Sequence, residues 1–237
     1  MYSIIEAFKK AFVLILSLDP ELLGIILLSL KVSGTALLIA SAIGLPLSAM
    51  LGLRKVPAKG IFVSLMNTFM GLPPVVVGLF VYMMLSRSGP MGFLGLLYTP
   101  SAMIIAQTIL ALPIVVSLCH SAIIAVDRNI RLASQTLGAT PFQTSITIIK
   151  EARYGIMSGI IAALGRVMAE VGAILIVGGN IAGYTRVMTT TIALETDKGN
   201  FELAVALGII LLTISLFINA LLHFVQKNGT VEAALWD

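Results

Sequence analysis

Five long apolar stretches constrain the fold of this 237-residue chain more than any other feature. A helix needs about 20 mostly apolar residues to cross a bilayer, because its backbone polar groups must be satisfied within the segment. The stretches that meet this requirement are residues 22–50, 61–85, 99–126, 156–177 and 201–225. With 58% hydrophobic and 11% charged residues, the chain is also too apolar for a soluble domain. The sequence predicts an all-α integral membrane protein with about five transmembrane helices.

Two clusters of cationic residues predict the orientation of these spans. They consist of Arg54, Lys55 and Lys59, and of Arg128, Arg131, Lys150 and Arg153. Such clusters in alternate loops mark the cytoplasmic side, so we expect the N-terminus outside and the C-terminus in the cytoplasm. Their position also makes a nucleic-acid surface a poor explanation for the net charge of +4.

The two ends of the chain are shorter segments. Residues 1–21 hold an apolar run that is too short for a signal peptide, and Asp19-Pro20-Glu21 follows it. We expect an interfacial helix there, with Lys9 and Lys10 on its polar side. Residues 227–237 are expected to form a short cytoplasmic tail.

Helix-breaking residues lie at depth in the first three spans, at 44–46, 71–74 and 111–113. Proline removes a backbone hydrogen bond and clashes with the preceding turn, so we expect each of these sites to kink or interrupt its helix. Transporters use broken helices to line a pathway, which makes Pro73 and Pro74 candidate pathway residues. The alternative is that proline and glycine are simply common in membrane helices.

The fourth span combines small residues with two charges. Arg166 and Glu170 lie four residues apart, on one face of a helix. A lone charge near the bilayer centre costs about 2.5–3.5 kcal/mol or more, so these two are expected to face protein or water and to pair with each other. They are either part of a pathway or gate, or a structural ion pair that fixes helix packing.

A polar, glycine-rich segment at 178–200 connects the last two spans on the predicted outer side. Asn180, Thr185 and Arg186 are further pathway candidates, because hydroxyls, backbone amides and a guanidinium can bind an anion. The alternative is a solvated loop with a short interfacial helix.

The predicted cytoplasmic loop 127–155 specifies a helix, a sharp turn and a second helix. A helix is expected from 128 to 137, with Gly138 in the left-handed position that ends it. Thr140 can then cap the next helix, with Pro141 in its first position and Gln143 completing a capping box. Such a corner is suited to docking in another protein, although it could also be an ordinary connection.

Residues 132–141, which read LASQTLGATP, resemble the EAA loop of ABC importer permeases. The match departs at Leu132, where the family usually has glutamate, but keeps the glycine-centred corner. The resemblance implies a coupling helix that docks in a groove of an ATPase subunit. The implied coupling residues are Ala133, Thr136, Leu137, Gly138, Ala139, Thr140, Pro141 and Phe142.

Other runs, at 67–79, 86–90, 170–173, 178–181 and 185–196, are similar to the tungstate-type branch of the molybdate and tungstate permeases. The resemblance implies a type I importer fold and transport of an oxyanion, tungstate first and molybdate or another anion as the alternative. It further implies a second copy of the chain, two ATP-binding subunits and an extracytoplasmic substrate-binding protein. The location implied is the inner cell membrane.

The sequence lacks the phosphate-binding motif GxxxxGK[ST], so we expect ATP hydrolysis on a separate subunit. No catalytic constellation, metal site or cofactor is expected. A secondary transporter is a weaker alternative, because broken spans and buried charges also fit that class. A haem protein ligated by His120 and His223 is weaker still.

Overall fold

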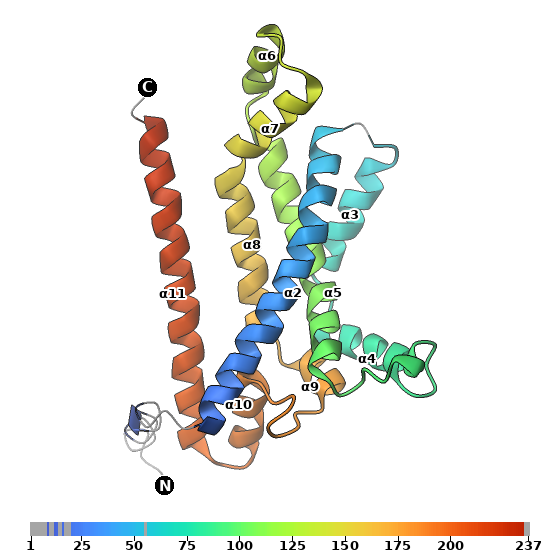
Figure 1. The fold of residues 1–237 in the computed structure, drawn as a ribbon, viewed down its shortest axis with the longest axis vertical. Helices are drawn as coiled ribbons and strands as arrows, with labels where there is room; N and C mark the ends of the chain where they lie inside the picture. The colour runs from blue at the N-terminus through green and yellow to red at the C-terminus, as the bar shows by residue number, and fades with distance from the viewer. Residues whose placement is uncertain (1–8, 10–11, 14–15, 17–19, 55, 235–237) are drawn as a thin grey trace. The chain divides into compact units, whose positions relative to one another are not determined.

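The computed structural model describes residues 9, 12, 13, 16, 20–54 and 56–234, with side chains up to residue 220. Most of the predicted interfacial helix at 1–21, including Lys10, therefore lies outside the described residues, as do Lys55 and the side chains of His223 and Lys227. The described part is helical and contains no strand. Its elements, which can be followed in Figure 1, are α2 (Pro20–Leu53), α3 (Lys59–Phe69), α4 (Pro74–Leu85), η1 (Gly92–Leu94), α5 (Pro100–Ile124), α6 (Arg128–Thr136), α7 (Pro141–Glu151), α8 (Arg153–Met168), α9 (Gly172–Gly178), α10 (Met188–Asp197) and α11 (Phe201–Ala234).

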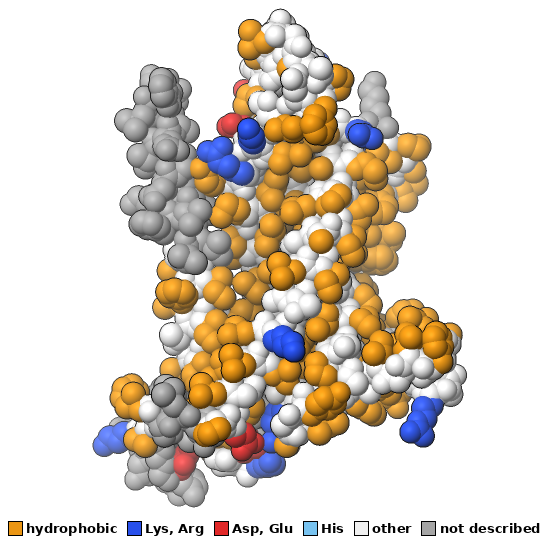
Figure 2. Space-filling model, in the orientation of Figure 1, with side chains coloured by type: hydrophobic (Ala, Val, Ile, Leu, Met, Phe, Trp, Pro, Cys, Tyr) orange, Lys and Arg blue, Asp and Glu red, His pale blue; other side chains and the backbone are white. Residues whose placement is uncertain are grey.

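Three helices among the described residues are long and apolar enough to cross a membrane. They are α2, α5 and the part of α11 from Phe201 to Ala220. Two further pairs, α3 with α4 and α8 with α9, would each make one broken span, which brings the total to five. Hydrophobic side chains dominate the visible surface, and this is what lipid contact requires (Figure 2). The prediction of an all-α membrane protein with about five spans is confirmed.

The helix-breaking sites behave differently from one another. Pro46 and Pro113 lie inside α2 and α5, which both continue through them, so the predicted interruption of these two helices is wrong. One missing N–H is tolerated in a long helix when the flanking turns remain intact. The third site does interrupt the helix, because Pro73 is extended (ψ 122°) and Pro74 begins α4.

The chain forms two compact units. The first comprises Met1–Ala36, Pro73–Ile109 and Gly165–Ile218, and the second comprises Leu37–Leu72, Leu110–Leu164 and Asn219–Asp237. In the first unit, Leu22 and Ile25 of α2 pack with Met188 of α10 and Leu207 of α11. In the second, Ile123 of α5 packs with Ile148 of α7 and the adjoining Ala152.

Small residues bring helices into close contact in the second unit. A Cβ placed on Gly155 would lie 2.7 Å from the Cβ of Ala122, and one on Gly159 would lie 3.0 Å from the Cβ of Leu118. The two glycines therefore allow α8 to pass close to α5. Cys119, the single cysteine of the chain, is fully buried in this contact, and its thiol faces the carbonyl of Ile156 at 3.7 Å.

Candidate functional site

The break between α8 and α9 holds the charged pair that the fourth span was expected to contain. Nη1 of Arg166 lies 2.8 Å from Oε2 of Glu170, so the pair forms. The side chain of Glu170 is 2% exposed, whereas that of Arg166 is 33% exposed. The carboxylate is therefore the buried partner, and the guanidinium is the one that remains accessible.

The expectation that this span is one continuous helix is wrong. α8 ends at Met168 and α9 begins at Gly172, with a bend of 57° between their axes. The second carboxylate oxygen of Glu170 accepts a hydrogen bond of 3.0 Å from the N–H of Ala173, which satisfies an amide in the first turn of α9. Glu170 thus stabilises both the charge of Arg166 and the start of the next helix.

Side chains from other helices satisfy the carbonyl groups near the break. Nε2 of Gln107, on α5, donates to the carbonyl of Val167 at 2.9 Å, and the hydroxyl of Thr189, on α10, donates to the carbonyl of Glu170 at 2.7 Å. Backbone polar groups in a membrane protein need such partners wherever a helix is interrupted. These contacts hold the break in a defined geometry.

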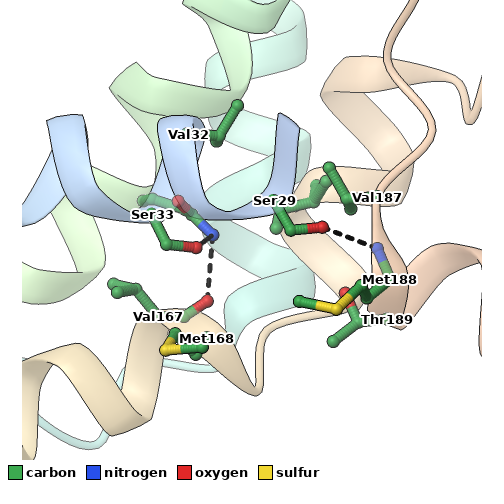
Figure 3. Close-up of a pocket in the computed structure, with 10 residues that line it drawn as sticks. Ser29, Val32, Ser33, Val167, Met168, Val187, Met188 and Thr189 are labelled. Carbon is green, nitrogen blue, oxygen red and sulfur yellow. Dashed lines mark hydrogen bonds between the residues drawn. The ribbon is translucent and has the colours of Figure 1, made fainter. Parts of the chain in front are cut away.

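A small cavity of about 10 Å³, the space of one water molecule, lies beside the break (Figure 3). Ser33 accepts a long hydrogen bond of 3.4 Å from Gln107 at its edge, and Ser29 accepts one of 2.8 Å from the N–H of Met188. Gln107 is fully buried, and its carbonyl oxygen lacks a partner among the described residues. The sequence interpretation did not single out Gln107, although an amide within an apolar span was a usable signal.

The pair Pro73 and Pro74 sets the start of α4, which packs closely on α9. A Cβ on Gly78 would lie 2.7 Å from the Cα of Ala173, and one on Gly172 would lie 2.8 Å from a methyl group of Val75. The two prolines therefore position α4, and α4 packs on α9, which begins directly after the break at Glu170.

Residues 178–200, the predicted outer segment, are more buried than a solvated loop would be. Thr185 is fully buried, where it donates to the carbonyl of Gly178 at 2.6 Å and accepts from the N–H of Ile181. The side chain of Asn180 accepts from the hydroxyl of Thr190 at 2.9 Å. These hydroxyl and amide groups fix a turn and the start of α10.

Arg186 is one of two cations in this segment, the other being Lys198. Its side chain is 18% exposed and lies 3.7 Å from the carboxylate of Glu21, while its Nε is buried without a partner among the described residues. Glu195 lies on α10, where a hydrogen bond from Lys198 lowers the pKa of its carboxyl, with a smaller contribution from the positive charge of Arg186. Arg186 therefore retains hydrogen-bonding capacity that the described residues do not use.

The corner between α6 and α7, in the second unit, has the local structure that its sequence predicts. Gly138 adopts φ +84°, and the N–H groups of Gly138 and Ala139 bond back to the carbonyls of Gln135 and Ser134. Thr140 and Gln143 form a reciprocal capping box, and Pro141 occupies the first turn of α7. The helix–turn–helix prediction is confirmed.

The corner exposes apolar side chains. Leu137 is 87% exposed and Phe142 is 74% exposed, on either side of Gly138. The hydroxyl of Thr136 is used locally, because it donates to the carbonyl of Ala133. Large apolar groups held out on a rigid turn are typical of a protein-binding surface.

Comparisons with known proteins agree with this arrangement. The family model described as "Binding-protein-dependent transport system inner membrane component" matches residues 44–228. A probable anion ABC transporter permease protein of Haloferax volcanii is 47% identical over 205 residues, which cover 84% of this chain and 88% of the relative. A tungstate uptake system permease protein of Peptoclostridium acidaminophilum is 42% identical over 228 residues, which cover 96% of this chain and 100% of the relative.

A solved structure has the same fold. The crystal structure of a bacterial alginate ABC transporter, in complex with its alginate-bound periplasmic protein, matches with a TM-score of 0.75 at 19% identity. The match covers 94% of this chain and 86% of that one. Because the family model spans most of the chain, the chain belongs to the family of inner membrane components of binding-protein-dependent transport systems.

Proposed function

We propose that this chain is the pore-forming permease subunit of an ATP-driven importer for a tetrahedral oxyanion, with tungstate as the first candidate and molybdate or another anion as the alternative. The observation that carries the proposal is the 42% identity to a tungstate uptake permease over that protein's full length. The permease resides in the inner membrane with its N-terminus outside and its C-terminus in the cytoplasm. A second copy completes the pore, a separate subunit hydrolyses ATP, and an extracytoplasmic protein delivers the anion.

In this proposal, the corner around Gly138 couples the permease to the ATPase. Leu137 and Phe142 insert into a groove of that subunit, and the capping box keeps α7 rigid, so that movement of the ATPase is passed to α8. The residues that form the coupling surface are Ala133, Thr136, Leu137, Gly138, Ala139, Thr140, Pro141 and Phe142.

The pathway in this proposal follows the α8–α9 break and the start of α4, both in the first unit. Arg166 supplies a partly exposed guanidinium that attracts a dianion, while Glu170 offsets its charge and prevents tight binding. Arg186, with its unused Nε, is the second cationic contact. Pro73 and Pro74 act as a hinge, and Asn180 and Thr185 act through the turn that supports α10.

The test of transport is uptake of tungstate, molybdate and sulfate by cells that lack this gene, with and without the wild-type gene. Restoration of tungstate uptake is the expected result. If the gene restores uptake of molybdate or sulfate but not of tungstate, the importer assignment holds and the tungstate assignment is wrong.

The test of coupling uses co-purification of the ATPase through a tag on the permease. Leu137→Asp is expected to reduce the amount of co-purified ATPase strongly, because it places a charge in an apolar contact. Phe93→Asp is the matched control, since Phe93 is 84% exposed and lies outside the corner. Equal recovery of the ATPase with both variants would contradict the coupling role.

A further inference from the structure

A groove of about 760 Å³ in the second unit shares only Thr140, Pro141 and Phe142 with the proposed coupling surface. It lies between the end of α2 and the α6–α7 corner, and we call it the α2–α7 groove. Its volume is within the range of about 300–1,000 Å³ that is typical of small-molecule sites. The residues that line it are Pro46, Ala49, Met50, Leu53, Arg54, Arg131, Gln135, Thr140, Pro141, Phe142, Thr144, Ser145, Ile148 and Ile149.

Two arginines line the groove. Arg54 follows the last residue of α2, and Arg131 comes from α6. Neither guanidinium forms an ion pair or hydrogen bond within the part of the chain that the structure describes, and the lining residues include no carboxylate. Two arginines in a groove whose own lining has no carboxylate favour binding of an anionic group there.

An unsatisfied hydroxyl lies in the same groove. Thr144 is 4% exposed, and its Oγ1 has no partner among the described residues. Ser145 and Thr147 on the same helix donate to the carbonyls of Pro141 and Gln143, four residues earlier, but Thr144 makes no such bond. A buried hydroxyl normally has an acceptor, so Thr144 can donate a hydrogen bond to a ligand oxygen in the groove.

The remaining walls are apolar. Met50 and Leu53 belong to the last turn of a helix whose most apolar window has a mean hydropathy of 2.2, and Ile148 and Ile149 face the groove from α7. The groove thus has apolar walls at the end of a membrane span, and the same groove contains two arginines and the hydroxyl of Thr144. A free inorganic anion would leave these walls uncovered, whereas a phospholipid has an acyl chain for the walls and a phosphate for the corner.

We propose that the α2–α7 groove binds an anionic phospholipid. The phosphate lies between Arg54 and Arg131 and accepts the hydrogen bond of Thr144, and one acyl chain lies along Met50 and Leu53. Basic pockets at the ends of transmembrane helices recognise lipid head groups in this way. The proposal depends on the membrane location of the chain and is independent of the transported ion.

The first experiment measures lipid retention by native mass spectrometry of the tagged transporter, purified with its accompanying subunits. Phosphatidylglycerol and phosphatidylcholine are added in separate titrations. Wild type is expected to retain phosphatidylglycerol more strongly, and each of Arg54→Gln and Arg131→Gln is expected to weaken that retention about fivefold. Thr144→Val keeps the side-chain shape and is expected to weaken it less, because it removes one neutral hydrogen bond.

Lys150→Gln is the matched control, because it removes one charge from an exposed position of α7 that does not line the groove. Its retention of phosphatidylglycerol is expected to equal that of wild type. If the arginine variants retain as much phosphatidylglycerol as this control does, the proposal is wrong. Competition by inorganic phosphate in excess would likewise overturn it, since the groove would then select a free anion.

The second experiment identifies the occupant in membranes. A photoactivatable residue at position 50, which is 41% exposed and lines the groove, is irradiated in the assembled transporter. An adduct with the mass of a phospholipid supports the proposal. A crosslink to the ATPase subunit or to a second copy of the chain, without a lipid adduct, shows a protein interface and overturns it.

Discussion

Replacement of Glu170 tests whether one buried carboxylate holds the α8–α9 break together. Its two oxygens accept hydrogen bonds from Arg166 and from the N–H of Ala173, at 2.8 and 3.0 Å. A hydrogen bond to a charged group contributes about 1.5–3 kcal/mol. Glu170→Ala removes both bonds, so we expect it to lower the free energy of unfolding by about 3–6 kcal/mol. Glu170→Gln keeps an oxygen for Ala173, and its expected cost is about 1–2 kcal/mol.

The unequal burial of the pair gives a sharper test. Arg166→Gln leaves a carboxylate that is 2% exposed without its cation, whereas Glu170→Gln leaves a guanidinium that is 33% exposed. A buried uncompensated charge is the more costly outcome. Arg166→Gln is therefore expected to destabilise more than Glu170→Gln, and the double variant less than Arg166→Gln alone.

Reversible unfolding in mixed detergent micelles, followed by circular dichroism, measures these differences. Lys150→Gln is the control for loss of an exposed charge. The reasoning is refuted if Arg166→Gln costs no more than Glu170→Gln, or if Glu170→Ala costs less than about 1 kcal/mol.

Three further predictions concern single positions. Gly138→Val is expected to lower the free energy of unfolding by about 1–2 kcal/mol and Gly138→Asn by less, as measured by thermal unfolding. The reason is backbone strain alone, because φ is +84° and the space around Gly138 is open. Gly78→Val is expected to lower the free energy of unfolding by about 1–3 kcal/mol or more in the same assay, because its Cβ would meet the backbone of Ala173. A smaller loss than that of Gly138→Asn would contradict this contact. The pKa of the Glu195 carboxyl is lowered chiefly by the hydrogen bond from Lys198. The stabilising contribution of this carboxylate is therefore present above the unfolded-state pKa and is lost as pH falls through the folded-state pKa. Glu195→Gln should flatten this acid-side loss of stability in a pH series of melting temperatures.

Local chemistry made some parts of the fold predictable from sequence. The length of their apolar runs identified α2, α5 and α11, because a membrane span is recognised by its length and apolar composition. The corner was equally predictable, since the left-handed glycine and the capping box depend only on residues 134–143. Pairing of Arg166 with Glu170 followed from their spacing and the cost of an isolated charge.

Long-range partners explain what sequence could not predict. The break at residues 169–171 is held by Gln107 and Thr189, which are distant in sequence, and the small residues around it are compatible with a continuous helix. Pro46 and Pro113 break no helix, whereas the break that Pro73 and Pro74 were expected to make is present. The burial of Thr185 likewise depends on a turn that its polarity does not reveal.

The burial of Cys119 has a practical consequence for spectroscopy. This single thiol is enclosed where α8 passes α5, next to Gly159, so a maleimide reagent in the folded protein has no route to it. A cysteine introduced at an exposed position outside the coupling corner, such as Phe93, can then carry a fluorophore or spin label in an otherwise unaltered sequence. Distance measurements during turnover become feasible without first building a cysteine-free background.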